Sequence, residues 1–200
     1  MTWRTLAVDV GGALDAAAAA LADGEAIVVP TDTVYGVASL PGHEDVLHAL
    51  KDRPASMPIA VLVASVGQAE ATAGQPLPAA ANRLAERFWP GPLTIVVPSV
   101  EGGTVGVRCP DHAFVLRLAA RVGPIATTSA NRHGEATPST AAEAAAALAA
   151  PGPSLVLDGG ACRGVASTVV DVSGATPRVL REGALPAADV IACATQRRRS

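Results

Sequence analysis

The chain has 200 residues, of which 50% are hydrophobic and 16% charged, a composition typical of a soluble globular protein large enough to bury one core. Aromatic residues make up only 2%, which argues against a nucleic-acid surface built on ring stacking. The formal net charge of −3 gives the protein as a whole no electrostatic reason to adhere to a polyanion.

The first half of the chain predicts helices that alternate with short strands. The first helix is closed by Gly24, and the β-branched run that follows it is ended by Pro30. The predicted helices cover residues 15–22, 44–51 and 78–88, and the predicted strands cover 26–29, 59–64 and 93–97. This alternation is typical of an α/β protein.

The second half adds strands more often than helices. Its best-marked helix begins at a capping box, Thr140 followed three residues later by Glu143, and an alanine run carries it to about residue 150. The other predicted helices cover 113–121 and 186–195, and the strands cover 104–108, 125–128, 155–157, 168–172 and 178–180. Strands in succession favour antiparallel pairing, so we expect an α/β fold with a single twisted, open, mixed sheet flanked by helices.

We expect one domain over residues 1–200, with a core at about 10–190 and a basic tail at 196–200 that is solvated rather than a binding device. No stretch reaches membrane-spanning length and no export leader is evident. The three cysteines are widely spaced, which predicts neither a disulfide framework nor a thiolate metal site. The same cysteine usage fits a reducing compartment, so we expect a cytoplasmic location. The four histidines show no ligand spacing, so we expect no protein-bound metal.

Four polar segments, at 30–36, 51–53, 104–108 and 128–131, each lie where an apolar run gives way to polar residues. Open α/β folds place ligand-binding groups at such points, so we expect the four segments to form one site. The site is not built on a recognisable phosphate loop, dinucleotide fingerprint, zinc-protease helix or nucleophile elbow, because none of those motifs is present.

Each segment also has a plainer interpretation. The run 30–36 offers hydroxyls and backbone N–H groups suited to an amino acid or a phosphate, and it equally fits an ordinary hydroxyl-stabilised turn. Lys51 and Arg53 suit phosphate oxygens, but alone they fit a solvated helix end better. Arg108 follows an alternating strand and suits a carboxylate clamp. Ser129 and Asn131 offer donors and acceptors in what is otherwise a turn.

Taken together, ordered motifs from about residue 26 to residue 183 resemble the YrdC/Sua family, the threonylcarbamoyl-AMP synthases. The motifs are Pro-Thr-Asp-Thr-Val-Tyr-Gly at 30–36, Lys-Asp-Arg-Pro at 51–54 with Pro58, Trp-Pro-Gly-Pro-Leu-Thr at 89–94, Thr-Val-Gly-Val-Arg at 104–108, Thr-Ser-Ala-Asn at 128–131, Ser-Thr-Val-Val-Asp at 167–171 and Leu-Arg-Glu-Gly at 180–183. Met57, Leu62 and His133 depart from residues common in the family, and the length predicts its short, single-domain form.

The resemblance implies an enzyme that condenses L-threonine, bicarbonate and ATP to threonylcarbamoyl-AMP and pyrophosphate, with Mg²⁺ carried by ATP. The product serves tRNA threonylcarbamoyladenosine modification through a downstream threonylcarbamoyl-transferase complex, and the family pattern leaves room for contact with tRNA or double-stranded RNA. The implied residues for L-threonine are Thr33, Arg108, Ser129 and Ser167. Those for ATP are Arg53, Thr104, Asn131, Ser139 and Arg181, together with Lys51, and Lys51 and Arg53 are the expected catalytic pair.

The chemistry of the residues agrees with that assignment. Carboxylation of an amine, followed by attack of the carbamate on the α-phosphate, needs orientation and cations where negative charge collects, but no covalent enzyme intermediate. Two alternatives stay open: a YciO-type paralogue with the same fold and another acceptor, and an RNA-binding module without catalysis.

Overall fold

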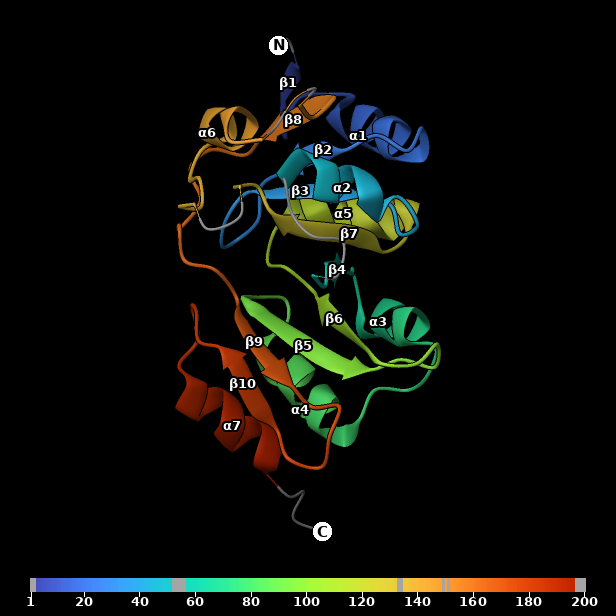
Figure 1. Cartoon of the computed structure of the whole chain (residues 1–200), viewed down its shortest axis with the longest axis vertical. Helices are drawn as coiled ribbons and strands as arrows, with labels where there is room; N and C mark the ends of the chain where they lie inside the picture. The colour runs from blue at the N-terminus through green and yellow to red at the C-terminus, as the bar shows by residue number, and fades with distance from the viewer. Residues whose placement is uncertain (1–2, 52–56, 133–134, 149, 151, 197–200) are drawn as a thin grey trace.

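The computed structural model describes residues 3–51, 57–132, 135–148, 150 and 152–196. Ten strands form one mixed sheet in the order β1-β8-β2-β3-β7-β4-β6-β5-β9-β10, and Figure 1 shows this sheet running through the length of the molecule with helices packed along it. The predicted single, open, mixed α/β sheet is therefore confirmed. None of the described helices is both long and apolar enough to cross a bilayer.

The strands are β1 (Arg4–Ala7), β2 (Ile27–Val29), β3 (Gly36–Ser39), β4 (Ala60–Leu62), β5 (Leu93–Pro98), β6 (Thr104–Arg108), β7 (Ile125–Ser129), β8 (Leu155–Asp158), β9 (Thr168–Asp171) and β10 (Arg178–Arg181). The helices are α1 (Ala13–Ala22), α2 (Glu44–Lys51), α3 (Val66–Ala73), α4 (Ala79–Phe88), α5 (Ala113–Val122), α6 (Ala141–Ala146) and α7 (Ala187–Thr195).

The half of the sheet that contains β2, β3 and β8 is buried on both faces. Along β2, Ile27 and Val29 belong to one core cluster with residues of α1 and α5, whereas Val28 belongs to another with residues of α2 and α6. This division follows from the two-residue period of a strand, which turns successive side chains to opposite faces. Strands covered in this way are rich in apolar residues, and all three β2 residues are buried.

The other half, from β4 to β10, has a different arrangement on its two faces. Leu93, Ile95 and Val97 of β5 pack with α3, α4 and α7 in a third core cluster. The alternate residues Thr94 and Val96 line a cleft instead. One face of this half-sheet is thus held by the helices and the other forms the floor of a cavity, which is the feature of the fold that creates the site.

Three elements escaped the sequence prediction: β1, β3 and α3. Strand β1 is an edge strand with mostly exposed residues, so its sequence shows no apolar periodicity. Strand β3 follows directly on a polar loop and begins at Gly36, although all four of its residues are buried between β2 and β7. Helix α3 has a weakly patterned sequence, but Ser65 caps it by accepting a hydrogen bond from the Gln68 N–H at 3.2 Å.

The expected antiparallel pairing of the three C-terminal strands is right for only one pair. Strands β9 and β10 are antiparallel, but β8 lies at the far end of the sheet, parallel to both β1 and β2. The cause is the segment between β8 and β9, which crosses from one half of the sheet to the other (Figure 1). Helix α6 also ends at Ala146, earlier than the alanine run predicts.

Candidate active site

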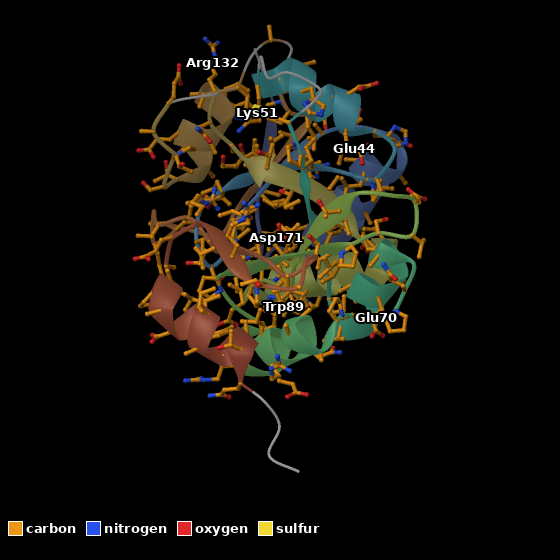
Figure 2. The ribbon with its side chains drawn as sticks, turned by 60° about the horizontal axis from the view of Figure 1, so that its bottom comes forward. Glu44, Lys51, Glu70, Trp89, Arg132 and Asp171 are labelled. Carbon is orange, nitrogen blue, oxygen red and sulfur yellow. The ribbon has the colours of Figure 1, made fainter. Side chains whose placement is uncertain are left out.

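A cleft of about 670 Å³ lies between the uncovered face of β4, β5, β6 and β9 and the residues that follow α2 and β7. Most of the predicted site residues line it: Lys51, Thr104, Arg108, Ser129, Asn131, Ser167 and Arg181. Lys51, labelled in Figure 2, belongs to the α2 side of the cleft, and Asp171 belongs to the β9 side. Convergence of the four polar segments into one cavity is confirmed for the residues that are described.

Lys51 is the last residue of α2 and is only 3% exposed. Its Nζ donates to the backbone oxygen of Ser129 and lies 3.4 Å from Ser129 Oγ and 3.5 Å from Asn131 Oδ1. The Asn131 amide is itself oriented, because its Nδ2 donates to the backbone oxygens of Arg132 and Glu135, both at 2.9 Å. A carbonyl, a hydroxyl and an amide oxygen thus hold the ammonium group at the cavity wall.

Arg108 ends β6 and is 6% exposed, with its guanidinium held on three sides. Its Nε donates to Gly91 O at 3.1 Å, its Nη1 to Thr33 Oγ1 at 2.8 Å and its Nη2 to Asp32 Oδ1 at 2.5 Å. Burial lowers the pKa of Arg108, and the charge of Asp32 opposes that shift. A fork fixed in this way is suited to present its remaining N–H groups to a carboxylate.

Thr33 is a support of Arg108 rather than part of the cleft lining. The hydroxyl of Thr31 donates to Val34 O at 2.6 Å and accepts from the Thr33 and Val34 N–H groups, both at 3.2 Å, and its oxygen lies 2.9 Å from Thr33 Oγ1. The Thr33 oxygen in turn accepts from Arg108. Because Thr33 is not among the residues that line the cleft, direct contact of Thr33 with L-threonine stays a prediction.

Ser167 lies immediately before β9, where two neighbouring strands hold it. Thr94 Oγ1 of β5 is 3.0 Å from Ser167 Oγ, and Arg181 of β10 donates to both the backbone oxygen and the hydroxyl of Ser167, at 2.8 and 3.2 Å. The turn after β10 can come this close only because residue 183 is glycine, since a Cβ there would lie 2.2 Å from Ala166 O.

Two predicted ATP residues are not among those that line the cleft as described, for different reasons. Arg53 lies outside the described residues. Ser139 is not part of the cleft lining: its backbone N–H and hydroxyl donate to Glu143 Oε2 at 3.0 and 3.1 Å, beside the predicted capping box of α6, which is present. A contact between Ser139 and ATP stays a prediction.

Residues that the sequence did not assign also build the site. Thr94 lines the cleft, and Asp32 pairs with Arg108. Tyr35 is fully buried and its hydroxyl donates to Gly160 O at 2.6 Å, tying the loop after β2 to the loop after β8. Burial raises the pKa of Tyr35 to about 12, so it stays neutral. The alternation along strand residues 93–97 could have shown that Thr94 lies on the face opposite the core. Asp32 and Tyr35 carry no such local signal, because their partners lie far away in sequence.

Two of the three cysteines are held as unreactive thiols. Cys162 donates from its Sγ to Thr31 O at 3.3 Å, and burial raises the pKa of Cys109 to about 11, so both are protonated thiols at neutral pH. Within the described ranges, no cluster of three or more His, Cys, Asp or Glu side chains is arranged to hold a metal ion.

Comparisons with known proteins agree on the family. A family model described as "Telomere recombination", covering the Sua5, YciO and YrdC proteins, matches residues 19–183. The threonylcarbamoyl-AMP synthase of Pyrococcus abyssi is 38% identical over 188 residues, which are 87% of this chain and 55% of the relative. The putative threonylcarbamoyl-AMP synthase of Mycobacterium tuberculosis H37Rv is 39% identical over 180 residues, 84% of this chain and 82% of the relative.

Solved structures give the same result. The crystal structure of Pyrococcus abyssi Sua5 complexed with L-threonine superposes with a TM-score of 0.86 and 32% identity, covering 96% of this chain and 61% of that one. Escherichia coli YciO, with a TM-score of 0.78 and 21% identity over 92% of this chain and 95% of that one, shows the shared fold alone. The chain spans about half the length of the Pyrococcus abyssi and Bacillus subtilis relatives, at 55% and 53%. With a matched family model over residues 19–183 and relatives of this similarity, the chain belongs to the Sua5/YciO/YrdC family.

Proposed function

We propose that this protein is an L-threonylcarbamoyladenylate synthase, which condenses L-threonine, bicarbonate and ATP to threonylcarbamoyl-AMP and pyrophosphate. The observation that carries the proposal is the gathering of Lys51, Arg108 and Arg181 with the hydroxyls of Ser129 and Ser167 around one cavity. Relatives named threonylcarbamoyl-AMP synthase support it.

In the proposed reaction the threonine amine attacks bicarbonate, and loss of water leaves a carbamate. A carbamate oxygen then attacks the α-phosphorus of ATP, and the bond to the β-phosphate oxygen breaks to release pyrophosphate. Negative charge gathers on the departing pyrophosphate, where Lys51, Arg181 and Arg53 are the cations proposed to stabilise it. Arg108 and Ser167 are proposed to hold the amino acid, and Ser129 and Asn131 to position Lys51 while contacting the substrates. Thr104 at the far end of β6 is assigned to ATP.

Mg²⁺ is proposed to enter with the triphosphate as part of the substrate, as is usual for phosphoryl and nucleotidyl transfer. We further propose a cytoplasmic enzyme that supplies a threonylcarbamoyl-transferase complex acting on tRNA, and contact with tRNA or double-stranded RNA belongs to the same proposal.

The test is pyrophosphate release by the purified protein supplied with ATP, bicarbonate and L-threonine. Turnover should require L-threonine and should be abolished in Lys51→Ala and Arg53→Ala. The matched control is Arg117→Ala, which removes an exposed cation of α5 and should leave turnover unchanged. Turnover retained in both site variants would remove those residues from the mechanism.

Two other results would replace the proposal. ATP turnover that another acceptor supports and L-threonine does not would identify a YciO-type paralogue. Tight tRNA binding at physiological salt without nucleotide turnover would identify a binding module.

A further inference from the structure

The hydroxyl of Ser167, a residue predicted to bind L-threonine, contacts two side chains. Arg181 is assigned to ATP, and Thr94 has no assigned role. Arg181 Nη2 donates to Ser167 Oγ at 3.2 Å, and Thr94 Oγ1 lies 3.0 Å from the same oxygen. Ser167 and Thr94 are each 6% exposed, and all three residues line the cleft. The Thr94–Ser167 contact can run in either direction, because each hydroxyl has one proton and two lone pairs.

The direction of this bond follows from what Ser167 meets in the cleft. An arginine only donates, so Arg181 occupies one lone pair of Ser167 Oγ. If the ligand group is an acceptor, Ser167 must donate its only proton to the ligand. The second lone pair of Ser167 Oγ then accepts a hydrogen bond from Thr94. If the ligand group is a donor, Ser167 accepts from it and gives its proton to Thr94 instead.

The charges around the cleft select the first arrangement. Three cations, Lys51, Arg108 and Arg181, line it against the single lining carboxylate of Asp171. Arg108 is paired with Asp32, but Arg181 donates directly to Ser167 Oγ, so an anionic group is the favoured occupant beside Ser167. We propose that Thr94 is a positioning residue that, together with Arg181, saturates the lone pairs of Ser167 Oγ and thereby commits the Ser167 proton to the carboxylate of the amino-acid substrate. The proposal rests on the proposed function, which supplies that amino acid.

The local structure keeps Thr94 in this orientation. Thr94 pairs with Val169 in the parallel β5–β9 ladder, so its side chain and Ser167 lie on the same face of the sheet. Its methyl group is turned toward Gly106, where an added Cβ would lie 3.5 Å from Thr94 Cγ2. Because a β-branched side chain is stiff about χ1, placing the methyl group on the side of Gly106 leaves the hydroxyl on the side of Ser167.

The experiment separates the hydroxyl of Thr94 from its shape. Thr94→Val keeps the branched shape and removes the hydroxyl, whereas Thr94→Ser keeps the hydroxyl and removes the methyl group. Binding of L-threonine and of L-threoninol, which lacks the carboxylate, is measured by calorimetry without ATP, and thermal unfolding checks that each variant is folded. Thr72→Val is the matched control, because it removes a threonine hydroxyl that bonds Gln68 O at 2.8 Å in α3.

Thr94→Val should weaken L-threonine binding about fivefold to tenfold, the range of one lost hydrogen bond. L-threoninol binding should change less than about twofold, so the preference for the carboxylate ligand falls. Thr72→Val should keep the wild-type preference. Thr94→Ser should keep more of it than Thr94→Val, because it retains the hydroxyl but loses the methyl group that directs it. In a Ser167→Ala background, Thr94→Val should have no further effect on the preference, because the proton that it orients is already gone.

An unchanged preference in folded Thr94→Val would overturn the role of Thr94 while leaving the proposed function in place. If Thr94→Val does not fold, Thr94→Ala takes its place with the same expected loss of preference. Failure of the wild-type protein to bind L-threonine would overturn the proposed function, and the role of Thr94 with it.

Discussion

Replacing Asp32 by alanine should destabilise the protein strongly, because it leaves the Arg108 charge buried without its partner. The ion pair joins Arg108 Nη2 to Asp32 Oδ1 at 2.5 Å, and the two side chains are only 7% and 9% exposed. Removing one partner of a buried pair commonly costs about 3–5 kcal/mol. We take the lower end, about 3 kcal/mol, because Thr33 and Gly91 still accept from the guanidinium.

For a chain of 200 residues, a loss of about 3 kcal/mol lowers Tm by roughly 6–12 °C. The control is Asp15→Ala, which breaks an ion pair with Arg121 whose side chains are 71% and 48% exposed. A pair exposed to that degree contributes less than about 1 kcal/mol, so Tm should fall by less than about 4 °C.

The assay is thermal unfolding followed by circular dichroism, with urea unfolding to give the free energy directly. Adding Arg108→Met to Asp32→Ala should recover part of the loss, since the double variant no longer buries an unpaired charge. A Tm for Asp32→Ala equal to that of Asp15→Ala would refute the reasoning, because Arg108 would then not depend on Asp32 for its burial.

Two further predictions concern the loops around the site. Gly183→Ala should lower the free energy of unfolding by about 1–3 kcal/mol and reduce threonine-dependent turnover, because the added Cβ would lie 2.2 Å from Ala166 O. Gly174→Ala, where an added Cβ meets no atom within 4 Å, is the control in the urea-unfolding and turnover assays. Burial holds the pKa of His112 below its usual value of 6.5 in the folded protein. As the pH falls below 6.5, the unfolded chain therefore binds a proton at His112 before the folded protein does, and the stability due to neutral His112 is lost. The stability advantage of wild type over His112→Gln, measured by urea unfolding, should therefore shrink between about pH 7.5 and 5.5, and parallel curves would contradict this.

Local patterns in the sequence were enough to predict the elements that carry their own signals. Helix α4 and strand β5 follow from apolar periodicity, and α6 from its capping box, because these signals act within a few residues along the chain. The ordered motifs likewise predicted that Lys51, Arg108 and Ser167 share one site, and all three line the same cleft. Their roles toward each substrate stay predictions.

Only the tertiary structure decided which strands are neighbours, and therefore what each polar side chain touches. Asp32 meets Arg108, Thr94 meets Ser167, and the short exposed strand β1 is ordered by pairing with β8. These contacts join residues far apart in the chain, and their energies depend on burial and on partners that no local pattern encodes. The sequence by itself thus determined the elements and the chemical groups available, while the long-range pairing of the sheet decided how those groups support one another.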